Sequence, residues 1–109
     1  MSLANEEAMM LIIPAARAGV SKILKKEHSM TQAKIAKILG TTQAAISKYL
    51  NGRYSKKVKE LEKRIVSEGI ADKIAANIAN GATEKSVSSS LDGIARNKAV
   101  VRMALRLSR

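Results

Sequence analysis

The chain has 109 residues, which fits one domain or one small domain with an appended helical segment. It contains no cysteine and one histidine, which excludes disulfides, thiolate zinc sites and multi-histidine metal sites. Apolar residues make up 46% of the chain and aromatic residues 2%, a composition that favours packed helices over a sheet. The formal net charge of +11 favours a polyanionic partner such as nucleic acid.

A first helix is predicted to end near Glu27, because apolar residues recur along it at helical spacing. Pro14 fits either the first turn of this helix or a kink in a helix that begins near Asn5. Thr31 is expected to cap a second helix over residues 32–39. Gly40 follows directly and can adopt the left-handed conformation that ends a helix.

A third helix is predicted from about Thr42 to Leu50, with Thr41 or Thr42 as its cap. Further helices are predicted over residues 55–68, from residue 70 to the Asn80-Gly81 pair, and after Thr83. The last of these contains SVSSSLDG, whose weak helix formers allow a break near Gly93. The fold class is therefore all-α.

The third predicted helix has two different faces. At 100° per residue, short or hydrogen-bonding side chains share one arc of about 140°. They belong to Gln43, Ala44, Ser47, Lys48 and Asn51, and the opposite arc holds Ala45, Ile46, Tyr49 and Leu50. A merely solvated helix face would carry more Glu and Lys. An amide, a hydroxyl and an alanine can approach base edges closely, so this face is expected to read DNA.

The basic residues gather around this helix. Residues 29–64 carry 9 basic and 2 acidic side chains, whereas residues 1–28 carry 4 and 3, and residues 65–109 carry 7 and 4. Such a concentration is expected where a protein faces phosphates.

The segment TQAKIAKILGTTQAAISKYLNGR resembles the helix-turn-helix of Cro/repressor-type (Xre-like) transcriptional regulators, and looks closest to short archaeal regulators of this type. Matching features are the small Ala36 where the helices cross, Gly40 at the turn and Ile46 as the apolar anchor of the second helix. Thr41 stands where the family more often has valine. The resemblance implies a repressor-like domain of about four helices over residues 1–68, with its motif at 31–53, followed by C-terminal helices over residues 69–109.

The resemblance also implies roles for single residues. The residues expected to meet base edges are Gln43, Ala44, Ser47 and Lys48. Those expected to contact phosphates are Gln32, Thr42, Asn51, Arg53, Lys56 and Lys57. Glutamine paired with adenine is the specific contact that the chemistry favours.

A heptad-like apolar series follows Thr83 and includes Leu91, Ile94, Val101 and Leu105. Such a series is more often internal core. One repressor-type unit reads only a short half-site, however, so these four residues are expected to form a homodimer contact. Lys98 within the series argues against a long coiled coil.

Two other functions remain open at this point: a module of antitoxin or adaptor type that binds a protein partner, and a nucleoid-type protein that coats DNA without reading it. A catalytic site, a cofactor, a metal and a small-molecule ligand are not indicated, and no enzyme motif is found. The longest apolar run, Ala8 to Ile13, is too short to span a bilayer. A cytoplasmic, nucleoid-associated protein is therefore expected.

Overall fold

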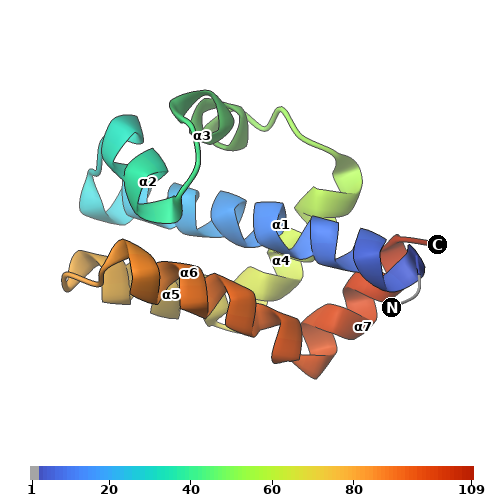
Figure 1. Cartoon of the computed structure of the whole chain (residues 1–109). Coiled ribbons are helices and arrows are strands. Elements are labelled where there is room, and N and C mark those ends of the chain that lie inside the picture. Colours follow the sequence, from blue (N-terminus) through green and yellow to red (C-terminus); the bar gives the residue numbers. More distant parts are fainter. Residues whose placement is uncertain (1–2) are drawn as a thin grey trace.

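Helix α1 (Leu3–His28) is the central element, and each of the other helices packs against it (Figure 1). The computed structural model describes residues 3–109, with side chains described from Glu6 onward, and all regular elements in that range are helical. The all-α prediction is confirmed for them. After α1 come α2 (Gln32–Leu39), α3 (Gln43–Leu50), α4 (Lys56–Ser67), α5 (Ile70–Ala79), α6 (Glu84–Gly93), the short 3-10 turn η1 (Ile94–Arg96) and α7 (Lys98–Leu107).

Helix α1 runs through Pro14, so of the two positions expected for this proline the first turn is wrong, and the position inside a helix that begins near Asn5 agrees with the structure. Proline lacks an N–H group and removes one hydrogen bond from the helix. The burial of apolar side chains before and after the proline compensates for this lost hydrogen bond. Ala8 and Ile12 precede it, Ala16 follows it, and all three are at most 2% exposed. The apolar face of α1 therefore extends further toward the N-terminus than the proline suggests.

The turn between α2 and α3 is built as the sequence predicts. Thr31 accepts a hydrogen bond from the Lys34 N–H at 3.2 Å, and Thr42, rather than Thr41, accepts one from the Ala45 N–H at 3.1 Å. Gly40 has φ 67°, the left-handed conformation that glycine adopts without steric cost. Its N–H donates to carbonyls in the last turns of α2, so α3 can begin three residues later in a new direction.

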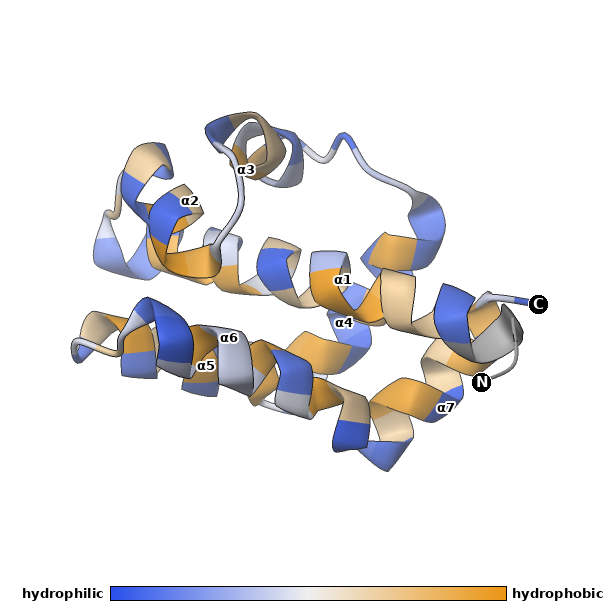
Figure 2. Cartoon of the chain, in the orientation of Figure 1, coloured by the Kyte–Doolittle hydropathy of each residue, from blue (hydrophilic) through white to orange (hydrophobic). Residues whose placement is uncertain are grey.

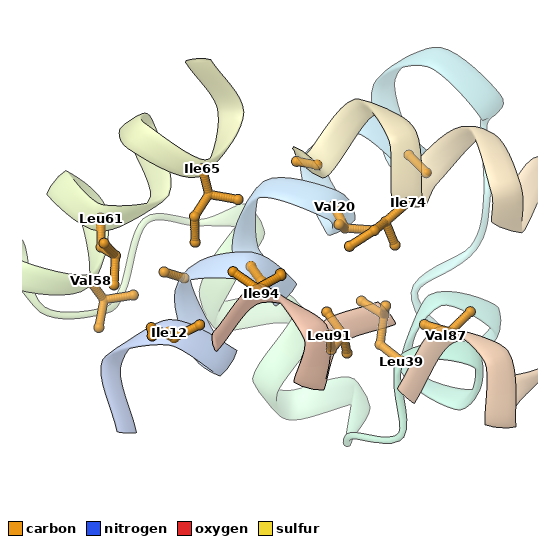
Figure 3. Close-up of a cluster of buried hydrophobic side chains, with 14 of the residues drawn as sticks. Ile12, Val20, Leu39, Val58, Leu61, Ile65, Ile74, Val87, Leu91 and Ile94 are labelled. Carbon is orange, nitrogen blue, oxygen red and sulfur yellow. The ribbon is translucent and has the colours of Figure 1, made fainter. Parts of the chain in front are cut away.

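One apolar core joins the two halves of the chain (Figure 3). Leu39 of α2, Leu61 and Ile65 of α4, Ile74 of α5 and Leu91 of α6 belong to the same buried cluster around α1. In Figure 2 the hydrophobic faces of the helices are turned toward this interior. The boundary predicted at residue 68 thus lies within a shared core.

Burial in the C-terminal helices shows that two of the four predicted dimer contacts, Leu91 and Ile94, are wrong. Leu91 and Ile94 are 3% exposed and lie in the core of the chain itself. The heptad-like series is interrupted because η1 separates α6 from α7, the break expected near Gly93. Val101 and Leu105 are half-buried on α7. Within residues 3–109, no helix has both the length and the apolarity needed to cross a bilayer.

Candidate nucleic-acid interface

Helix α3 presents the neutral face that the sequence predicts. Ile46 is fully buried against α1 and α2, which orients the opposite side of the helix outward. Gln43, Ala44 and Lys48 are exposed, and Ser47 is half-buried. The four residues predicted to meet base edges therefore lie on one accessible side of α3.

Asn51 ends α3 and completes this side. Its side-chain amide donates to the Ser47 hydroxyl oxygen at 3.3 Å, which links the last turn of the helix to the outward face. The Ser47 hydroxyl hydrogen, the second Asn51 amide hydrogen and the Asn51 amide oxygen remain available, so the pair presents two donors and an acceptor side by side.

The predicted phosphate contacts surround α3. Gln32 is half-buried at the start of α2, while Arg53, Lys56 and Lys57 are exposed between the end of α3 and the first turn of α4. Thr42 is exposed although its oxygen caps α3. Figure 1 shows α2, α3 and the segment leading to α4 on one side of α1, with α5 and α6 on the other.

Residues 20–63 match the family model described as helix-turn-helix, of the Xre/Cro-like class. The chain therefore contains a helix-turn-helix of the Cro/repressor type. The match begins within α1, includes α2 and α3 and ends within α4, and it does not distinguish archaeal members from others. No curated protein and no solved structure matches the chain. The family is one of DNA-binding regulators.

The helix-turn-helix domain contains a polar network that the sequence reasoning missed. Lys22 of α1 donates to the Tyr54 hydroxyl oxygen at 2.6 Å and to Glu62 Oε2 at 2.8 Å, and the Tyr54 hydroxyl donates to the other Glu62 oxygen. Glu62 is 7% exposed. The network therefore ties the segment after α3 to both α1 and α4. The Tyr54 hydroxyl is therefore engaged in hydrogen bonds within the domain.

The sequence does carry a signal for this network. Val58, Leu61, Glu62 and Ile65 follow the i, i+3, i+4, i+7 pattern of one helix face, so the carboxylate lies on the apolar side of α4. A charge there needs a partner.

The pKa values of Lys22 and Tyr54 in this network are both raised. Burial lowers the pKa of Lys22, but the hydrogen bonds to Glu62 and Tyr54 outweigh this effect and leave the pKa above 10.5. Burial and the hydrogen bond to Glu62 raise the pKa of Tyr54 above 10.0, against the effect of Lys22. Both groups therefore act as donors at neutral pH.

The back of α3 rests on an aromatic pair. Tyr49 and Tyr54 meet edge to face, with ring centroids 5.7 Å apart. Burial raises the pKa of Tyr49, while the nearby Arg17 guanidinium lowers it, and the net shift is upward. Tyr49 packs against the core, as its place in the apolar arc predicts. Among residues 3–109 there is no cluster of acidic or histidine side chains that could hold a metal ion.

Proposed function

We propose that the chain is a transcriptional regulator that binds double-stranded DNA in a sequence-specific manner, with α3 in the major groove. The observation that carries the proposal is the contrast between the two sides of α3. Ile46 is 0% exposed on one side, while Gln43, Ala44 and Lys48 are exposed on the other. A face with one positive charge and several hydrogen-bonding groups suits base edges better than it suits phosphates alone.

Base reading and phosphate binding are assigned to different residues. Gln43, at the first position of α3, has an amide that can pair with adenine N6 and N7. Arg53, Lys56 and Lys57 have exposed cations beyond the end of the helix, where they would fix its register on the backbone. Gln32 and Thr42 lie at the N-terminal ends of α2 and α3 and would add uncharged phosphate contacts.

Binding as a homodimer is part of the proposal, because one recognition helix reads only a half-site. The candidate contacts are Val101 and Leu105 on α7, together with Met10, which is 75% exposed on the part of α1 that precedes Pro14. Met10→Glu is expected to shift the chain toward the monomer in sedimentation measurements. An unchanged association constant would remove this face from the dimer contact.

The decisive experiment is selection of binding sites from a random DNA pool, followed by titration of the selected site. Gln43→Ala is expected to relax the base preference at its position by about 1–3 kcal/mol. Asn77→Ala, an exposed amide change on α5, is its matched control. Recovery of no common motif would contradict sequence-specific binding and favour a nucleoid-type protein or a protein-binding module.

Phosphate contacts are tested by charge. Lys56→Ala with Lys57→Ala is expected to weaken binding to selected and random DNA alike, and to lower the salt slope by about 1.8 for two phosphates. Lys73→Ala with Lys85→Ala removes the same charge from α5 and α6, on the opposite side of α1. If both double variants change the slope equally, binding depends on net charge and not on this surface.

A further inference from the structure

A cavity of about 320 Å³ lies between α1, α2 and α6, beside the turn that precedes α3. Its volume falls within the range of small-ligand pockets, roughly 300–1,000 Å³. The lining includes Ile13, Arg17, Ile38, Leu91, Glu84 and Asp92. Aliphatic walls, one cation and two carboxylates therefore surround the same space.

Arg17 is the unusual member of this lining. Its Nε atom is buried and has no hydrogen-bond partner, although a hydrogen bond from the rest of the Arg17 guanidinium contributes to the pKa of Tyr49. Buried donors are nearly always paired, since an unpaired one costs about 1–3 kcal/mol. No ion pair in the described part of the chain joins Arg17 to Glu84 or Asp92, although all three line the cavity. A bound ligand could therefore supply the acceptor that the Arg17 Nε–H group lacks.

We propose that this cavity binds a small zwitterion, an α-amino acid with an aliphatic side chain. Its carboxylate would accept hydrogen bonds from Arg17, and its ammonium group would donate to Glu84 or Asp92. Its side chain would lie on Ile13, Ile38 and Leu91. A simple anion would meet two carboxylates, and a simple cation would leave the Arg17 donor unpaired and close to a like charge.

The position of the cavity connects it to α3. Its wall includes Leu39, at the end of α2, and Gly40, in the turn. Arg17, in the same wall, lies close enough to Tyr49 at the back of α3 to lower the pKa of that tyrosine. Leu39 and Leu91 of the lining are neighbours in Figure 3. An amino acid bound here would therefore change DNA affinity, a consequence that rests on the proposed function.

Ligand binding is tested without DNA, by titrating the ¹⁵N-labelled full chain with L-leucine into the millimolar range. Leucine is expected to shift the amide resonances of Arg17, Gly40 and Ser88. Two truncated probes serve as controls: 4-methylpentanoate lacks the ammonium group, and isopentylamine lacks the carboxylate. The proposal is overturned if leucine, isoleucine, valine and methionine all leave these resonances unchanged, or if either truncated probe binds as tightly as leucine.

Variants then locate the site. Arg17→Gln, and separately Glu84→Gln with Asp92→Asn, are expected to weaken leucine binding about tenfold or more. Glu84 and Asp92 are exposed, so their substitution leaves the core intact even if the Arg17 variant unfolds. Asp72→Asn, an exposed change on α5 outside the cavity, is expected to have no effect. Equal weakening by the Asp72 variant would place the ligand elsewhere.

The coupling has its own readout. Leucine is expected to change the dissociation constant of the selected DNA about fivefold or more. An unchanged constant, with leucine bound, would overturn the coupling and leave the ligand site standing. Failure to select any DNA would count against the proposed function, while the resonance titration would still decide whether the cavity binds an amino acid.

Discussion

Replacing Glu62 with glutamine tests whether the buried network supports the helix-turn-helix domain. The change keeps the side-chain volume and removes the charge that Lys22 and Tyr54 both contact. Weakening the charge-assisted bond from Tyr54 to a neutral one should cost about 1 kcal/mol. The Lys22 side chain is 44% exposed, so the loss of its ion pair adds about 1 kcal/mol or less.

The expected loss is thus about 1–2 kcal/mol, or about 4–8 °C in melting temperature at roughly 4 °C per kcal/mol. Thermal and urea denaturation of the two proteins would measure it. Glu68→Gln is the matched control, because Glu68 pairs with Arg64 at 3.7 Å on the surface, where an ion pair contributes little. A Glu62→Gln variant no less stable than the Glu68 control would refute the structural role of the network.

Three further outcomes are expected in denaturation experiments. Gly40→Ala should cost about 1–2 kcal/mol, because φ is 67° and the added methyl meets no atom, whereas Gly93→Ala, at helical φ with equal space, should be neutral or stabilising. Equal effects would contradict the left-handed turn. Thr42→Ala should cost about 1 kcal/mol through loss of the α3 cap, and Thr41→Ala less; the reverse order would reassign the cap. Burial raises the pKa of Tyr49 above 10.0, because the buried phenol favours its neutral form. The stabilisation of the folded state that comes from this shift is complete below pH 10.0, and it is lost as pH rises through the folded-state pKa. Tyr49→Phe should therefore lose less stability than the parent above pH 10.0, and parallel melting curves across that range would argue against it.

The helix-turn-helix could be predicted from sequence because local signals agree there. Thr31 and Thr42 each accept a hydrogen bond from a free N–H group at the start of a helix, and Gly40 ends a helix. All three act through contacts within a few residues, so their roles do not depend on the rest of the fold. The helical spacing and the family resemblance both assigned Ile46 to the core, and it is fully buried.

Long-range contacts are what the sequence concealed. Lys22 and Glu62 are separated by 40 residues, and their pairing requires α1 and α4 to be placed side by side. Leu91 and Ile94 fit a dimer seam as well as they fit a core, since spacing does not tell which surface covers an apolar face. The cavity beside Gly40 likewise exists only where three helices meet.

The helices before and after residue 68 all pack against α1, and this affects how the chain unfolds. Leu24 of α1 lies in the same buried cluster as Ile46 of α3 and Val87 of α6, so α3 cannot come free without disturbing helices that follow residue 68. Hydrogen exchange in the two regions is therefore expected to proceed through one cooperative opening. A fragment cut to residues 20–63 would lack residues 3–19 of α1 and the helices α5, α6 and α7 that pack against it, and it is therefore expected not to fold.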